Sequence, residues 1–118
     1  GTEQSKRLIE EAEKRAAQIR AEAVKAAERA RKEGYARADQ LEQKSAKNPI
    51  AAIAAKESAK RLRTETDKRA KQLVSEADKR ASQVVDEARK REAQMLSEAA
   101  KRGDQTTKAL EGQTDRVR

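Results

Sequence analysis

Three consecutive segments that repeat at a period of 11 decide the fold: Glu65–Ser75 (ETDKRAKQLVS), Glu76–Asp86 (EADKRASQVVD) and Glu87–Ser97 (EARKREAQMLS). Their shared pattern is Glu, Ala, any residue, Lys, Arg, Ala, any residue, Gln, two apolar residues and a polar one. A fading fourth copy begins at Glu98 and breaks at Gly103. A period this regular indicates one structural unit repeated along the chain.

The first half of the chain follows the same period more loosely. The segment Glu11–Ile19 (EAEKRAAQI) matches the pattern nearly fully, and Glu22 and Glu33 begin the next two units. Gly34 and Tyr35 stand where alanine would be expected, which predicts a tight helix crossing or a local irregularity there. The repeat therefore covers most of the chain.

The spacing within each unit predicts an amphipathic helix. Apolar residues occupy unit positions 2, 6 and 9, and 11 residues over three turns give about 3.67 residues per turn. The apolar stripe stays on one face and drifts slightly, toward a right-handed supercoil. The first Glu of a unit precedes Lys and Arg by three and four residues, as Glu76 precedes Lys79 and Arg80. Each such pair stabilises a helix by roughly 0.2–0.5 kcal/mol.

The composition excludes an ordinary globular core. Charged residues make up 42% of the 118 residues, aromatic residues make up 1%, and Tyr35 is the sole aromatic residue. High charge with few aromatics also fits disorder, but the sustained periodicity favours a coiled coil. We therefore expect one elongated, all-α domain.

The pattern is interrupted once, at Lys44–Pro49 (KSAKNP). Asn48 is a good helix N-cap, and Pro49 suits the first helical position because its missing N–H is not needed there. We predict helices over about residues 2–46 and 49–102 with a turn at 47–48, and Gly103 as a stop before a frayed or partly helical tail over 103–118.

The break is either a kink in one rod or the turn of an antiparallel hairpin, and the hairpin is preferred. Folding near residue 47 pairs positions whose numbers sum to about 93–94, so that Leu41 meets Ile53 and Ile19 meets Leu73 and Val74. In this register Met95 and Leu96 have no partner in the same chain. The predicted helix–helix interface comprises Leu8, Ile19, Leu41, Ile53, Leu62, Leu73, Val84 and Leu96.

A hairpin with a stripe made mainly of alanine buries little apolar surface. We therefore expect it to self-associate, or to pair with another helical protein, through four-helix packing.

Catalytic and metal-binding patterns are missing from the sequence. With no His and no Cys, the common nucleophiles, bases and soft-metal ligands are absent. Carboxylates such as Glu10 and Glu11 lie among basic residues, as solvated helix faces do. We expect neither an enzyme nor a cofactor, a metal site or a small-molecule substrate.

The net charge of +8 is concentrated in one stretch. Residues 44–64 hold six basic side chains and one acidic one, a balance of +5. Such a tip either keeps the protein soluble or binds an anionic membrane surface, nucleic acid or an acidic protein. Nearby aromatic residues that could stack on bases are missing, which disfavours nucleic acid. The candidate basic residues are Lys44, Lys47, Lys56, Lys60, Arg61 and Arg63.

The compartment stays open. The sequence contains no apolar run of membrane-spanning length and no signal-peptide pattern. Gly1 has the form of a cleavage scar, and removal of an upstream targeting segment would place the chain in the bacterial periplasm or cell envelope.

The segments Glu11–Ala16 (EAEKRA) and Glu76–Ala81 (EADKRA) resemble the peripheral-stalk helices of rotary ATPases, which act as stiff tethers. This resemblance implies a tether or scaffold. The repeat is also similar to the 11-residue units of late-embryogenesis-abundant proteins, and a basic hairpin is similar in architecture to periplasmic holdase chaperones. Three functions stay open: a structural or oligomerisation element, a module that binds membranes or polyanions with its tip, and a holdase.

Overall fold

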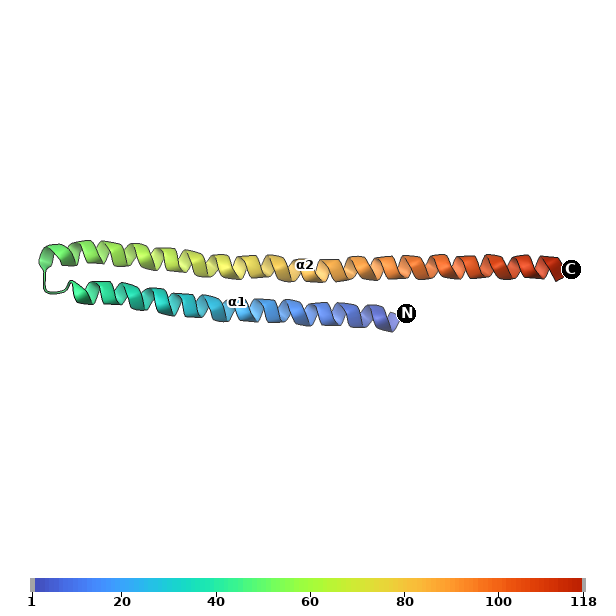
Figure 1. Ribbon diagram of the computed structural model, residues 1–118, viewed down its shortest axis with the longest axis horizontal. Helices are drawn as coiled ribbons and strands as arrows, with labels where there is room; N and C mark the ends of the chain where they lie inside the picture. Colours follow the sequence, from blue (N-terminus) through green and yellow to red (C-terminus); the bar gives the residue numbers. More distant parts are fainter. Residues whose placement is uncertain (1, 118) are drawn as a thin grey trace.

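The computed structural model is an antiparallel hairpin of two long helices (Figure 1). It describes the backbone of residues 2–117 and the side chains of residues 2–113. Helix α1 spans Thr2–Lys44 (43 residues) and α2 spans Pro49–Val117 (69 residues). The molecule extends 104 × 17 × 9 Å, so that α2 sets its length. The predicted all-α hairpin is confirmed.

The turn is built by the residues that the sequence singled out. The Asn48 side-chain Oδ1 accepts hydrogen bonds from the backbone N–H of Ile50 (3.1 Å) and of Ala51 (3.3 Å). Two of the free N–H groups at the start of α2 are thereby satisfied. Pro49 occupies the first position of α2 as predicted.

The far end of α2 differs from the prediction. The helix passes through Gly103 and Gly112 and continues to Val117, well beyond the expected end at Arg102. No described glycine has a positive φ angle, so Gly103 does not adopt the conformation of a C-terminal cap. One interior glycine costs about 1 kcal/mol relative to alanine, and the Thr106 and Thr107 hydroxyls donate hydrogen bonds to the carbonyl oxygens of Arg102 and Gly103 as the helix continues.

The seam between the helices consists of small side chains. In α1, buried residues recur every 11 positions at Ser5, Ala16, Ala27 and Ala38. In α2, they recur every 11 positions at Ala55, Thr66, Ala77 and Ala88, and again at Ala59, Ala70 and Ala81. No large side chain is fully buried in the described part of the chain. The seam therefore lets the two backbones approach closely, and the larger apolar residues lie beside it.

The closest approach is between Gly34 and Thr66. A Cβ placed on Gly34 would lie only 2.8 Å from the Thr66 Cβ, and closer still to the Thr66 Oγ1 and Cγ2 atoms. The tight crossing expected at Gly34 is therefore observed. Its cause is the absence of a side chain and not a special backbone angle, since no described glycine has a positive φ angle.

This contact also fixes the register. Positions 34 and 66 sum to 100, and Arg20 with Asp78 (sum 98) and Asp39 with Arg63 (sum 102) agree. The predicted pairing, in which residue numbers sum to 93–94, is therefore wrong: each residue of α1 lies opposite a residue of α2 about two helical turns further along the chain than predicted. The reason is that α2 begins about two turns beyond the end of the paired part of α1, so the fold does not pivot symmetrically about residue 47.

The shifted register corrects two further expectations. Ile53 is 70% exposed and does not pack against Leu41, which is itself 39% exposed. Met95 and Leu96, expected to have no partner in the chain, lie around the same surface hollow as Thr2 and Ser5 of α1. Only the part of α2 beyond about residue 98 projects past α1 (Figure 1).

We predict that Gly34→Ala lowers the thermal unfolding midpoint of the hairpin. The added methyl group overpacks the contact with Thr66, at a typical cost of about 1–3 kcal/mol that outweighs the gain in helix propensity. Circular dichroism during heating measures the effect.

Gly103→Ala is the matched control, because nothing lies within 4 Å of the Cβ that it adds. This variant should keep or raise the midpoint, and the double variant Gly34→Ala/Thr66→Gly should recover stability. An unchanged midpoint for Gly34→Ala would contradict the close approach.

Candidate functional site

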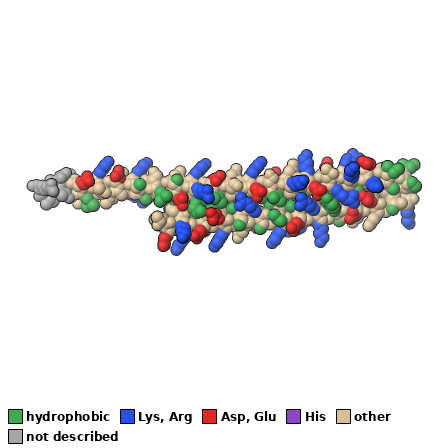
Figure 2. Space-filling model, turned by 180° about the vertical axis from the view of Figure 1, so that it is seen from behind, with side chains coloured by type: hydrophobic (Ala, Val, Ile, Leu, Met, Phe, Trp, Pro, Cys, Tyr) green, Lys and Arg blue, Asp and Glu red, His purple; other side chains and the backbone are tan. Residues whose placement is uncertain are grey.

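The hairpin tip carries exposed apolar and basic side chains together. Ile50 is 82% exposed and Ile53 is 70% exposed, because α1 has ended before it could cover them. Lys44, Lys47 and Lys56 are also exposed. Figure 2 shows hydrophobic side chains gathered at the hairpin end of the rod. The tip is therefore an amphipathic surface and not simply a charged one.

The predicted basic residues of the tip divide into two groups. Lys44, Lys47, Lys56, Lys60 and Arg61 are exposed.

Arg63 is half-buried and is held by α1. Its guanidinium donates to Asp39 Oδ1 (2.7 Å) and to Glu42 Oε1 (2.8 Å), and these hydrogen bonds raise its pKa further above the ordinary value. Arg63 therefore braces the hairpin and is not part of the free basic tip.

One polar cluster braces the middle of the hairpin. The Tyr35 hydroxyl donates to the Asp67 carboxylate, 3.0 Å from Oδ1 and 2.9 Å from Oδ2. Arg31 lies 3.6 Å from the same carboxylate. The hydrogen bond to Asp67 raises the pKa of the Tyr35 hydroxyl above 10, because it stabilises the neutral form. A raised pKa means that this bond stabilises the hairpin below about pH 10 and stops doing so as the pH rises through the folded-state value.

The two long edges of the seam differ in character. On one edge, Arg20 and Arg31 of α1 reach Asp78 and Asp67 of α2, and Glu42 reaches Arg63. We call this the ion-paired edge. The apolar residues Ile9 and Leu96 end it near the N-terminus of α1, where they line one hollow.

The opposite edge is apolar throughout. Residues 11 positions apart lie on the same face of a helix. On this edge, one such series from each helix contains only apolar residues. We call them the apolar strip: Leu8, Ile19, Ala30 and Leu41 of α1, with Leu62, Leu73, Val84 and Met95 of α2. Across the seam the members lie in four levels, Leu8 with Met95, Ile19 with Val84, Ala30 with Leu73, and Leu41 with Leu62.

The predicted interface residues are distributed unevenly over these surfaces. Six of the eight belong to the apolar strip: Leu8, Ile19, Leu41, Leu62, Leu73 and Val84. Of these six, Leu41 is exposed and the others are half-buried. Leu96 is 49% exposed on the ion-paired edge, and Ile53 lies at the tip. The structure thus places these residues beside the seam or away from it, and the seam residues are small.

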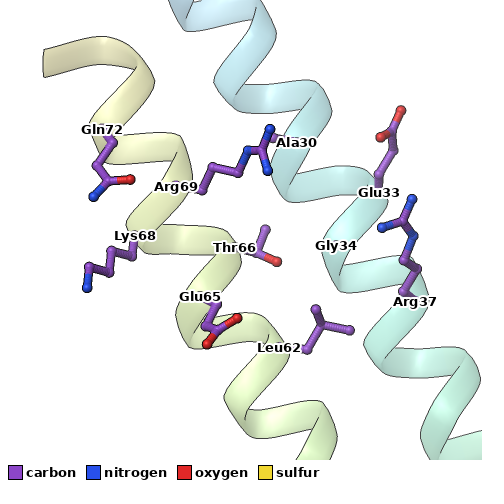
Figure 3. Close-up of a pocket in the computed structure, with 10 residues that line it drawn as sticks. All are labelled: Ala30, Glu33, Gly34, Arg37, Leu62, Glu65, Thr66, Lys68, Arg69 and Gln72. Atoms are coloured by element: carbon purple, nitrogen blue, oxygen red, sulfur yellow. The ribbon is translucent and has the colours of Figure 1, made fainter. Parts of the chain in front are cut away.

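A hollow of about 780 Å³ opens in the apolar strip beside the Gly34–Thr66 contact (Figure 3). Ala30, Gly34, Leu62 and Thr66 contribute to its lining. The hollow exists because Ala30 replaces the larger residues of the other levels. Its rim carries charges of both signs: Glu33, Arg37, Glu65, Lys68 and Arg69.

Other kinds of site have little support within the described residues. They include no group of three or more carboxylates placed to hold a metal ion. No helix found there is long and apolar enough to cross a bilayer. The candidate functional surfaces are therefore the tip and the apolar strip.

Comparisons with known proteins give no relative. No protein-family model matches the chain, no curated protein matches it, and no solved structure matches it. The likeness to rotary ATPase stalk helices thus has no support from sequence families or structures. Any assignment of function depends on the surfaces described above.

We predict that the tyrosine absorbance of this chain titrates with a midpoint above pH 10, and that Asp67→Ala lowers the midpoint. Tyr35 is the only tyrosine, so the signal has one source. Asp78→Ala is the control, since Asp78 pairs with Arg20 one repeat away. Equal midpoints in the parent chain and the Asp67 variant would contradict the hydrogen bond.

Proposed function

We propose that this chain is a non-catalytic structural protein whose hairpin acts as a stiff spacer and oligomerisation element. The observation that carries the proposal is the doubled helix itself. An uninterrupted α2 of 69 residues is braced by an α1 of 43 residues. The resemblance of the repeat to stalk helices points to the same kind of role.

The bracing repeats along the part of the rod where the two helices are paired. The seam repeats every 11 positions, and ion pairs lie at Arg20–Asp78, Arg31–Asp67 and Arg63–Glu42. A helix alone curves readily and is marginally stable when short, whereas a second helix packed along it opposes both tendencies. A molecule built from equal repeat units suits a spacer, because the function of a spacer depends on its length and not on a single site.

Removing one unit from both helices should shorten the rod and keep its structure. We predict that deleting residues 11–21 together with residues 79–89, which lie opposite each other, shortens the longest dimension by about 16 Å. Helical content per residue should stay the same, because the remaining units still pair. Small-angle scattering and circular dichroism measure the two quantities.

Deleting residues 11–21 alone is the matched control. It leaves α2 at full length, so the longest dimension should not change. Loss of helical structure in the double deletion would show that the units are not interchangeable, and the spacer proposal would be wrong.

A second candidate function is attachment of the tip to an anionic membrane. The exposed Ile50 and Ile53 at the end of the rod favour it, because exposed apolar side chains flanked by lysine suit the interface of a bilayer. The balance of +5 over residues 44–64 adds attraction to anionic lipids. A tip attached in this way would hold the rod away from the membrane surface.

We predict that the chain sediments with vesicles of phosphatidylcholine and phosphatidylserine at low salt and less so at high salt. The variant Ile50→Ser/Ile53→Ser/Lys47→Gln should bind at least tenfold more weakly. Lys101→Gln/Lys108→Gln, at the other end of α2, is the control with changed charge. If both variants lose binding equally, the attraction is unspecific and the tip has no such role.

A further inference from the structure

We infer that the apolar strip docks against the apolar strip of a second copy of this chain, with the two hairpins pointing in opposite directions. The inference deepens the proposed function, since it names the partner and the face through which the scaffold assembles. It depends on the difference between the two edges of the seam, which the repeat alone does not reveal.

The first step is that the two edges differ in polarity, since one carries ion pairs between the helices and the other carries a row of residues without charge. On the ion-paired edge, charged groups of the two helices neutralise one another. On the apolar strip, Leu41 is 39% exposed and the other seven members are half-buried beside the small seam residues, with no charged residue among them. Seven are large apolar side chains, and all eight lie along one line about 50 Å long, since residues 8 and 41 are 33 positions apart. Monomeric proteins rarely expose an apolar patch this extended.

The second step is the area. The strip crosses two packed helices, whose axes typically lie about 8–10 Å apart. Together with the charged rim on either side, its length brings the contact toward the roughly 800 Å² per partner of a standard protein–protein interface. A face-to-face pair of hairpins is also a four-helix arrangement, which encloses an apolar centre between the two strips.

The third step is the shape of the strip. Its hollow is at Ala30, and the neighbouring level holds Ile19 and Val84. Consider two antiparallel hairpins whose strips face each other, with the twofold axis passing between the Ala30 level and the Ile19 level. The Ile19 side chain of the second copy then lies over Ala30 of the first. This Ile19 side chain enters the hollow, and the same contact recurs twice because a twofold interface is self-complementary. The charged rim of both signs can pair across the interface.

The fourth step is charge, which selects the direction. If the two hairpins pointed the same way, two tips with a balance of +5 each would lie side by side. Opposite directions place the tips at the two ends of the assembly, many Debye lengths apart. Each tip then lies beside the near-neutral C-terminal part of α2 in the other copy. Like charges therefore favour the antiparallel dimer.

The oligomeric state of single-residue variants tests the face. The parent chain should form a dimer in light scattering, and Leu73→Glu, on the strip, should weaken dimerisation at least tenfold. Val74→Glu is the matched control, because Val74 is the next residue and is half-buried like Leu73, but lies on the ion-paired edge. Its dimer should persist. A parent chain that stays monomeric at high concentration overturns the proposal, and so does equal weakening by the two variants.

Disulfide trapping tests the direction, since the chain has no cysteine of its own. The variants Ile19→Cys and Ala30→Cys, mixed and oxidised, should form mainly the mixed dimer. If Ile19→Cys instead links mainly to a Val84→Cys variant, which lies at the same level, the hairpins point the same way and the charge argument is wrong. The antiparallel dimer should also measure about 115 Å in small-angle scattering, longer than the 104 Å of one hairpin, because both α2 ends project.

These outcomes separate this inference from the proposed function. A stable, helical monomer 104 Å long that passes the paired-deletion test would remain a spacer, and only the dimer would be disproved. A chain that dimerises through the strip but fails that test would be an oligomerisation element without the modular rod.

Discussion

The close approach of two helices along a seam of small side chains is the constraint on which the rest of this structure depends. Alanine contributes one methyl group per position, roughly 0.8 kcal/mol when buried, against roughly 1.5–3 kcal/mol for a larger apolar side chain. The seam is therefore weak per residue, and its strength comes from repetition along the 43 residues of α1. It also leaves no room for large residues between the helices, which moves leucine, isoleucine and valine to the edges. The edges, and not the core, thus carry the surfaces with which this protein can act.

A repeated seam creates a problem of register, because a slip by one whole unit places alanine opposite alanine again. The pair Gly34 and Thr66 removes that ambiguity. Both occupy the second position of their units, where other units have alanine, and they meet each other across the seam. In the observed register, glycine makes room for threonine. If the helices slipped by one unit, a gap would be left beside the glycine and the threonine would clash with the residue opposite it. Tyr35 with Asp67, one position further along both helices, adds a hydrogen bond that a slipped chain would lose.

The sequence was sufficient for the helices, the turn and the hairpin, because each depends on local signals such as the Asn48 cap and Pro49. The register was predicted wrongly, because pairing bulky residues about the turn assumes that they face each other. They flank a seam of alanine instead. The matching departures from alanine at Gly34 and Thr66 were present in the sequence and would have given the right register. The end of α2 was also missed, since a glycine such as Gly103 ends a helix by adopting a positive φ angle, and Gly103 does not adopt one.

The same register has a consequence for the ends of the molecule. Because α2 begins about two turns beyond the paired part of α1, Ile50 and Ile53 are left uncovered at one end, and α2 projects as a single helix at the other. In a symmetric hairpin, α1 would have covered Ile50 and Ile53, and the projecting single-helix part of α2 would have been shorter. The offset therefore gives the rod two different ends: one short, apolar and basic, the other long and mixed in charge. A rod with unlike ends can hold two different structures apart, which a symmetric rod cannot do. The position of one glycine thus bears on the length, the faces and the polarity of the whole molecule.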